Sequence, residues 1–316
     1  MKHKTWMSTL FKYSRLIILA LLFGFFSLAT KTFFSVSNLD NFKNIVAQQV
    51  PFLIILSIGM TIAILLKGID LSIGAVLALS SCIAALVLRA TQNILLCIAA
   101  GLATGAVFGA FNGLLIARVG LSPYIATYTV QWVSKGVAFV LLGGSQIFNF
   151  PAGFRELFTG WFYTLLIISL AVAALLWVLM SKTTFGRNVY AVGNNAEAAR
   201  LSGVNVPRVY VLSFTLIGLL AALTGLMYIA NLGAAEPVIG DNFAIQAIAA
   251  TLIGGTSFGG GKGSVANAVV GACIMTTLTN GLLHLGVHSY WQQFAIGVVI
   301  VLSILLERFA KRYVRD

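Results

Sequence analysis

Long apolar runs are the feature that most limits what this chain can fold into. A helix needs about 20 apolar residues to cross the hydrocarbon core of a bilayer. A run near 243–256 is short and ends in glycines, so we expect it to cross obliquely or to be broken. Nine others meet or approach the full length, at about 16–34, 45–66, 71–88, 94–116, 121–142, 161–180, 209–232, 264–285 and 289–306. The pattern predicts an all-α polytopic membrane protein with about ten transmembrane helices.

The composition excludes a soluble globular domain and gives no sign of a second domain. Of the 316 residues, 59% are hydrophobic and only 9% are charged, whereas soluble domains carry about 25% charged residues. The longest loops between runs cover about 143–160 and 181–207. We therefore predict a single transmembrane domain over residues 1–316. In the fourth run Gly105 and Gly109 lie four residues apart, a spacing that permits close packing of helices.

The positive charge of the chain follows its predicted topology. The formal net charge is +12, and the cytoplasmic loops of membrane proteins carry an excess of Lys and Arg. With both termini in the cytoplasm, Lys135 falls inside the fifth run and four basic residues fall outside, namely Lys31, Lys43, Arg89 and Arg155. Fifteen fall inside, namely Lys2, Lys4, Lys12, Arg15, Lys67, Arg118, Lys182, Arg187, Arg200, Arg208, Lys262, Arg308, Lys311, Arg312 and Arg315. This bias predicts cytoplasmic N- and C-termini and makes the charge a topology signal rather than a nucleic-acid site.

The stretch GGTSFGGGKGS at residues 254–264 has the look of a phosphate-binding loop but lacks its chemistry. A Walker loop needs G-x-x-x-x-G-K-[ST], in which the final hydroxyl binds Mg²⁺. Here Gly263 follows Lys262, and Thr256 stands where the first glycine belongs. We interpret the stretch as a turn between two membrane helices, with Lys262 at the water interface and no nucleotide to hold.

The polar residues give no catalytic or metal-binding pattern. The histidines, His3, His284 and His288, have no metal-ligand spacing, and the cysteines form no C-x-x-C pair. The acidic residues fall in loops or at the ends of runs; Asp70 is the deepest and is placed to cap the third run. We predict no enzyme activity and no metal site. Any uphill transport would draw its energy from another subunit, because ion-coupled carriers place carboxylates inside the membrane.

The inside loop at about 181–207 contains a predicted short helix, NNAEAARLSG at residues 194–203. Asn194 can cap it, Glu197 falls at its third position, and Gly203 is placed to end it in the left-handed conformation. Two turns of helix are marginal in water by themselves. We therefore expect a partner surface to hold this helix, and the alternative is that it rests on its own bundle.

The same residues carry a family resemblance. Glu197-Ala198-Ala199-x-x-x-Gly203 matches the E-A-A-x-x-x-G coupling motif of ABC importer permeases. From about residue 45 to its end, the chain resembles the ribose-type monosaccharide permeases of that superfamily. The matching segments are GIDLSIGAVLALS (68–80), FGRNVYAVGNNAEAARLSGVNV (185–206), AIAATLIGGTSFGGGKGS (247–264) and NGLLHLGVHSYWQ (280–292).

The resemblance implies a permease subunit in a bacterial cytoplasmic (inner) membrane. It would pair with a second permease, identical or not, and with an extracytoplasmic sugar-binding protein. A cytosolic ATPase would bind ATP and Mg²⁺, and this chain would carry no cofactor. A ribose-like sugar is the first expectation for the substrate. A furanose-like signal molecule or another small polyol is the alternative, and a facilitator that works without ATP is a third reading, against which the coupling motif weighs.

Polar residues inside the runs are candidates for a sugar pathway, because a sugar presents hydroxyl groups and an apolar face. For the two asparagines among them, the alternative role is a hydrogen bond between helices. The lysine is a candidate because burial of a cation inside the membrane is energetically costly and points to a functional role. The alternative is that its side chain extends to the outer interface. The candidates are Asn112, Gln131, Lys135 and Asn280, with Phe111 and Trp132 beside them.

Overall fold

The computed structural model describes the backbone of residues 2–34 and 39–315, and the side chains of residues 15–34 and 39–305. The basic residues Lys2, Lys4, Lys12, Arg308, Lys311, Arg312 and Arg315 lie outside those described side chains. The described chain is almost entirely helical, with two π-helical segments (η) and one pair of short strands. The elements are α1 (Lys2–Ala29), α2 (Asp40–Asn44), η1 (Ile45–Gln49), α3 (Val50–Leu65), α4 (Ile73–Thr91), α5 (Ile94–Leu114), η2 (Leu115–Val119), α6 (Pro123–Leu142), β1 (Ile147–Phe148), α7 (Ala152–Thr159), α8 (Thr164–Lys182), α9 (Thr184–Asn194), α10 (Ala196–Leu201), α11 (Val206–Leu232), β2 (Ala234–Ala235), α12 (Phe243–Ile253), α13 (Val265–His284) and α14 (Ser289–Arg315).

The structure confirms a polytopic, all-α membrane protein. Within the described residues, seven helices are long and apolar enough to cross a membrane. Three further apolar stretches are shorter: α12 at Phe243–Ile253, and the parts of α1 and α14 whose side chains are described, at Arg15–Ala29 and Ser289–Leu305. These three match the runs predicted at 16–34, 243–256 and 289–306. The sequence therefore located the helices. Among the described residues seven are full-length candidates, and of the other three apolar helices only α12 is short over its whole length.

The core of the bundle is built around α3 and α11. Every residue of α3 is buried, and α11 packs against α5, α4 and α3. The approach of α5 to α11 is close enough to need glycine: a Cβ at Gly105 would meet the carbonyl oxygen of Gly218, and one at Gly109 would meet that of Phe214. The close packing predicted for the Gly105/Gly109 spacing is therefore confirmed.

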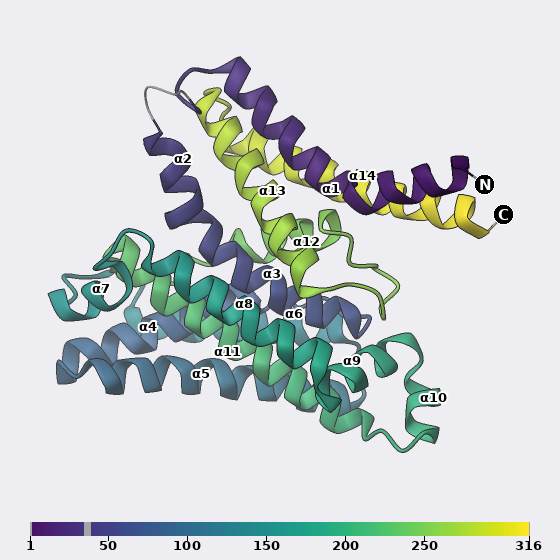
Figure 1. The fold of residues 1–316 in the computed structure, drawn as a ribbon. Coiled ribbons are helices and arrows are strands. Elements are labelled where there is room, and N and C mark those ends of the chain that lie inside the picture. Colours follow the sequence, from purple (N-terminus) through teal and green to yellow (C-terminus); the bar gives the residue numbers. More distant parts are fainter. Residues whose placement is uncertain (1, 35–38, 316) are drawn as a thin grey trace.

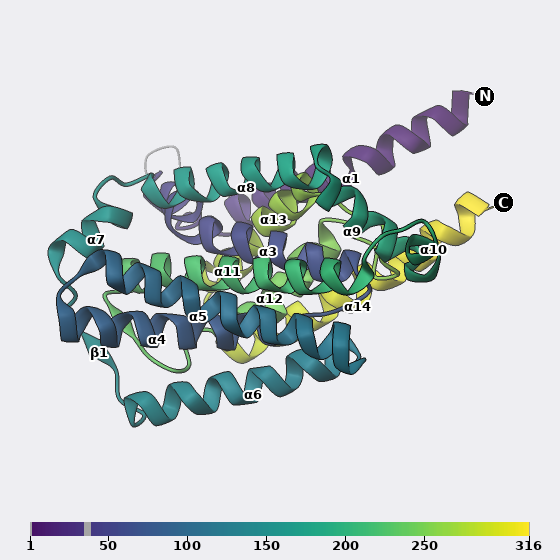
Figure 2. The same cartoon turned by 90° about the horizontal axis from the view of Figure 1, so that it is seen from below.

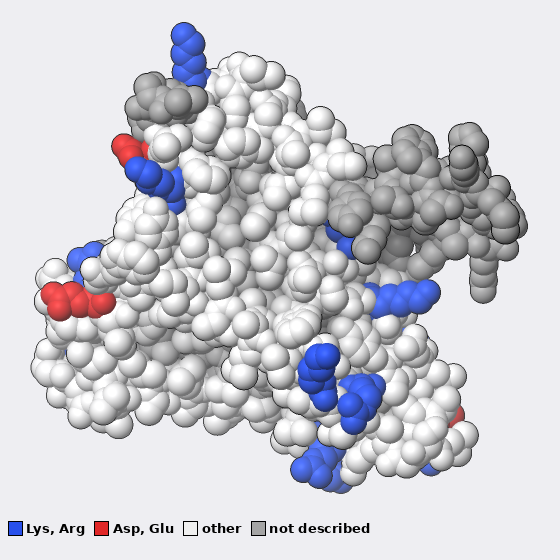
Figure 3. Space-filling view, viewed as in Figure 1, with Lys and Arg blue, Asp and Glu red and all other residues white. Residues whose placement is uncertain are grey.

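The loops predicted to share a side of the membrane share an end of the molecule. At one end, which we call the α10 end, Lys67 donates a hydrogen bond to the carbonyl of Asn194 and Gly261 donates one to the carbonyl of Leu65. The first and last described residues also lie toward this end (Figure 1, Figure 2). At the opposite end, the α7 end, Arg155 reaches the carbonyl of Ala230, and β1 pairs antiparallel with β2. The face seen in Figure 3 carries its charged side chains toward these two ends, with a broad uncharged band between them.

The run near 243–256 forms a helix too short to cross the bilayer alone. The 11 residues of α12 cover about 16 Å at the usual rise, whereas the hydrocarbon core is about 30 Å thick. An irregular segment, residues 236–242, covers the rest: it leaves β2 at the α7 end and brings Gly240 against Gly74 in the first turn of α4. The structure thus favours a crossing broken into a helix and an irregular segment over a single oblique helix. Irregular backbone at membrane depth is tolerated where it lines a cavity or is buried in protein.

Candidate functional site

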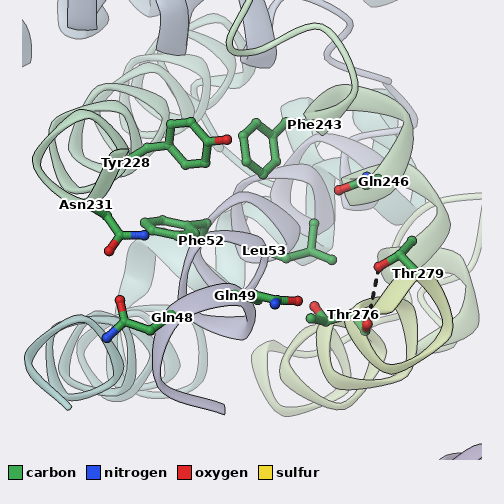
Figure 4. A pocket seen from close by; sticks show the side chains of 10 residues that line it. All are labelled: Gln48, Gln49, Phe52, Leu53, Tyr228, Asn231, Phe243, Gln246, Thr276 and Thr279. Carbon is green, nitrogen blue, oxygen red and sulfur yellow. Dashed lines mark hydrogen bonds between the residues drawn. The ribbon is translucent and has the colours of Figure 1, made fainter. Parts of the chain in front are cut away.

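A cavity of about 270 Å³ lies between helices in the half of the bundle nearer the α7 end. Its walls come from η1 and the start of α3, the last turns of α11, the first turn of α12 and the second half of α13. Figure 4 shows Gln49, Phe243 and Gln246 pointing into the space that these elements enclose. The lining residues are Gln48, Gln49, Phe52, Leu53, Tyr228, Asn231, Phe243, Gln246, Thr276 and Thr279.

The lining combines hydrogen-bonding side chains with aromatic faces. Phe52 and Tyr228 meet edge to face at 5.1 Å between ring centroids, and Tyr228 meets Phe243 in the same way at 5.3 Å. The remaining lining residues, Leu53 apart, are amides and threonines, which donate and accept without carrying charge. Such a surface suits a neutral ligand that offers both hydroxyl groups and an apolar face.

The π-helical turn η1 helps to place two of the amides. Gln48 donates a hydrogen bond to the carbonyl of Phe162 at 2.8 Å, and Gln49 accepts one from Asn280 at 3.1 Å. A π-turn inserts extra residues into a helical repeat, so neighbouring side chains leave their regular faces. Both glutamines thereby reach the cavity although they are adjacent in the sequence.

Two of the four predicted pathway residues lie at or near this region. Asn280 is 4% exposed and adjoins the cavity through its bond to Gln49, while its Oδ1 accepts from Asn41 at 3.1 Å. Lys135 is held by Asp241, with its Nζ 2.8 Å from both carboxylate oxygens. Asp241 stands two residues before α12, so this ion pair ties α6 to the segment that leads into the cavity wall.

The other two predicted residues lie elsewhere. Asn112 is 1% exposed and donates a hydrogen bond at 2.8 Å to the hydroxyl of Ser72, which in turn donates to Asp70 at 2.6 Å. This hydrogen bond joins α5 to the start of α4. Asp70 also accepts from the amide of Ser72 at 2.8 Å, but Ser72 is itself the N-cap of α4, so the prediction that Asp70 caps this helix is wrong. Gln131 is half-buried on α6 and is not among the cavity residues.

The predicted short helix is present as α10, but its cap differs by one residue. Asn195, not Asn194, is the N-cap, and its side chain accepts from the amides of Glu197 and Ala198. Asn194 instead ends α9, because the chain turns into extended backbone only at Asn195. Gly203 has a φ of +85°, so the predicted left-handed end is confirmed.

The side chains of α10 point largely to solvent. Glu197 forms an exposed ion pair with Arg200 at 2.6 Å, and this hydrogen bond lowers the pKa of Glu197. Ala199 is buried, and Leu201 is 76% exposed. A Cβ added at Gly203 would meet nothing within 4 Å. The helix therefore rests on α9 and α11 along one side and leaves the other side open to a partner.

Sequence reasoning missed most of the cavity. The sequence did contain an indication of it, namely amide side chains inside apolar runs: Gln48 and Gln49 in the second run, and Gln246 in the shortest run. Nothing local, however, indicates that these positions face one another, since they come from helices about 200 residues apart along the chain.

The fold and the cavity together define the class of this protein. A bundle of membrane-spanning helices around an uncharged polar cavity, with one broken helix in its wall, is the architecture of a membrane transport protein. The chain matches over residues 42–304 the family described as branched-chain amino acid transport system / permease component. It belongs to this permease family.

Its relatives include permeases named for sugars. The ribose import permease protein RbsC of Escherichia coli (strain K12) is 38% identical over 319 residues, covering 96% of this chain and 95% of the relative. RbsC of Bacillus subtilis (strain 168) is 39% identical and covers 83% of each chain. The D-allose transport system permease protein AlsC of Escherichia coli (strain K12) is 35% identical, covering 95% and 93%. No solved structure matches the chain.

Proposed function

We propose that this chain is a membrane subunit of an ABC importer for a monosaccharide, with a ribose-like sugar as the favoured substrate. The observation that carries the proposal is the cavity, whose amides, threonines and aromatic rings match the hydroxyl groups and apolar face of a sugar. The names of the relatives support the same class of substrate. A furanose-like signal molecule or another small polyol would present similar chemistry and is the alternative.

The proposal includes an assembly. A second permease completes the pathway, an extracytoplasmic sugar-binding protein delivers the sugar, and a cytosolic ATPase binds ATP and Mg²⁺. In this assembly α10 is the coupling helix, with Glu197, Ala198, Ala199 and Gly203 at or beside the docking surface. Its open side and the absence of any crowding around Gly203 support this role.

The orientation is also part of the proposal. We place the α10 end in the bacterial cytoplasm, together with both termini, in a topology of about ten crossings. The predicted charge bias supports this, and so does the position of the two chain ends on the side of α10 (Figure 1). The cavity then lies in the outer half of the membrane, where a sugar released by a binding protein would arrive.

Two matched variants test where the sugar passes. Gln246 lines the cavity and Gln131 does not, so Gln246→Leu and Gln131→Leu remove the same amide from two membrane helices. We expect Gln246→Leu to slow ATP-driven uptake of radiolabelled ribose into proteoliposomes about tenfold, the usual effect of one lost hydrogen bond in a desolvated site. Gln131→Leu should stay within about twofold of the unmodified protein.

The outcomes separate the alternatives. Reduced uptake in Gln131→Leu alone would move the pathway to α6, which carries two of the four predicted candidates, Gln131 and Lys135. Uptake that continues without the ATPase would support a facilitator. Uptake of another small polyol in preference to ribose would change the substrate but keep the class of protein.

A further inference from the structure

The glycine-rich stretch that resembles a phosphate-binding loop in sequence forms a connection between two helices. Residues 254–264 connect α12 to α13 at the α10 end. The loop folds onto itself through a hydrogen bond from the amide of Ser257 to the carbonyl of Lys262 at 2.7 Å. Its outer edge touches two other chain segments, which are the end of α3 and the end of α9. We call this three-way contact the glycine junction, made of residues 65–67, 190–194 and 260–263.

Three hydrogen bonds hold the glycine junction together. The amide of Gly261 donates to the carbonyl of Leu65 at 2.9 Å, which joins the loop to α3. The hydroxyl of Tyr190 donates to the carbonyl of Gly263 at 2.9 Å, which joins α9 to the loop. The Nζ of Lys67 donates to the carbonyl of Asn194 at 3.0 Å, which joins α3 to α9. Each of the three segments is thus bonded to both of the others.

Glycine lets the three segments approach closely. A Cβ at Gly193 would collide with the carbonyl oxygen of Leu65, and one at Gly260 would collide with the side chain of Lys67. Gly260 and Gly261 have φ values of +78° and +67°, which glycine adopts without strain. The contacts of Gly193 and Gly261 with Leu65 join backbone to backbone and have no rotamers to change, so they fix the end of α3 closely against the other two segments. The side chains of Tyr190 and Lys67 complete the junction.

Each segment of the glycine junction leads to a functional region. The residue after Asn194 is Asn195, the N-cap of α10. In the other direction, α3 carries Phe52 and Leu53 to the cavity wall, and α12 and α13 carry Gln246 and Thr276. The junction therefore lies between the short exposed helix and three of the helices that line the cavity.

We propose that the glycine junction is a rigid link that transmits displacement of α10 to α3, α12 and α13, and so to the cavity. This inference rests on the proposed function, in which an ATPase moves α10. Tyr190 and Lys67 act as positioning residues, since neither lines the cavity and each bonds to backbone of another segment. Weakening their bonds lets α10 move while the cavity helices stay behind, so ATP is hydrolysed without transport.

The test uses the permease reconstituted with its ATPase and sugar-binding protein in proteoliposomes. The variants are Tyr190→Phe, which removes only a hydroxyl, Lys67→Met, which removes only a charged terminus, and their combination. The measured quantity is the number of sugar molecules transported per ATP hydrolysed. We expect a reduction of about twofold in each single variant and fivefold or more in the double variant, with ATPase co-purification unchanged. Tyr128→Phe and Lys31→Met are the matched controls and should keep the ratio of the unmodified protein.

The outcomes distinguish this inference from the proposed function. If the unmodified protein neither retains an ATPase nor transports a sugar, the proposed function fails and the inference falls with it. If the unmodified protein transports and the junction variants keep its ratio, the inference alone is overturned. A lower melting temperature with an unchanged ratio overturns it as well, because the junction would then only hold the fold together.

Discussion

The two ends of α3 are packed in different ways. At its start, Phe52 and Leu53 face a cavity lined by long amide side chains and aromatic rings. At its end, the carbonyl of Leu65 touches the backbone of Gly193 and accepts a hydrogen bond from Gly261. One helix therefore joins a region where long side chains line an open space to a region where backbone packs directly against backbone.

The difference shows how one bundle can serve two tasks. A cavity that receives a polar ligand needs side chains that can adjust to it, and long unbranched side chains such as glutamine have several staggered rotamers available. A link that carries movement needs close packing, because packed interiors are stiff and transmit strain. The following predictions are designed to break or to sharpen this contrast, beginning with the largest expected effect.

Gly193→Val should damage the fold itself. Its Cβ would collide with the carbonyl oxygen of Leu65, which is backbone and cannot rotate away. Overpacking of this kind costs about 1–3 kcal/mol, occasionally more, so we expect low yield or a melting temperature reduced by several degrees in detergent. Gly136→Val is the control, because nothing lies within 4 Å of a Cβ there. Equal melting temperatures of the two variants would contradict the rigid packing described for the junction.

Gly203→Val should leave the fold intact and remove function. The site has open space but a φ of +85°, so a side chain strains the end of α10 by roughly 1 kcal/mol and crowds the proposed docking surface. We expect a normal melting temperature, normal docking of the sugar-binding protein, and loss of both ATPase co-purification and uptake. Normal association with normal uptake would show that α10 is only a surface helix.

Lys135→Leu should have a moderate effect on uptake. Its Nζ holds Asp241, and both side chains are partly exposed, at 27% and 46%, so the pair contributes at most about 1 kcal/mol. We expect membrane abundance to stay constant and uptake to fall about threefold, because Asp241 positions the segment before α12. The double variant Lys135→Leu/Asp241→Leu should recover part of the loss, since it leaves no unpaired charge. Full uptake in Lys135→Leu would assign this lysine a purely structural role.

Lys262→Ala should have the smallest effect: we expect no change in nucleotide binding. Two amides of the glycine loop are already in use: that of Gly260 donates to the carbonyl of Ser257 within the loop, and that of Gly261 donates to the carbonyl of Leu65 at the end of α3. A phosphate would have to displace these bonds, and Gly263 offers no hydroxyl for Mg²⁺. Calorimetry on the purified chain should detect no ATP binding before or after the substitution. Micromolar affinity that disappears in Lys262→Ala would restore the phosphate-loop reading.

Properties that depend on neighbouring residues could be predicted from the sequence. The apolar runs located the helices because the bilayer core demands a continuous apolar length, which is a local property. The left-handed end at Gly203 followed from helix-end chemistry, and the close packing of α5 from the Gly105/Gly109 spacing, although its partner α11 did not. The predicted N-cap of α10 was wrong by one residue. Asn194 and Asn195 have the same side chain, and only the backbone conformation, helical at Asn194 and extended at Asn195, shows which of them is the cap.

Properties that depend on partners far along the chain were decided by the tertiary structure. The cavity joins Gln49 to Gln246, the ion pair joins Lys135 to Asp241, and the glycine junction joins α3 to α9 and to the loop before α13. A local pattern reports which residues are apolar and where a turn can form, whereas the pairing of distant residues depends on how the helices pack. The sequence thus determined that this chain is a helical membrane protein with a short helix in its longest predicted inside loop, and packing decided which of its polar residues meet.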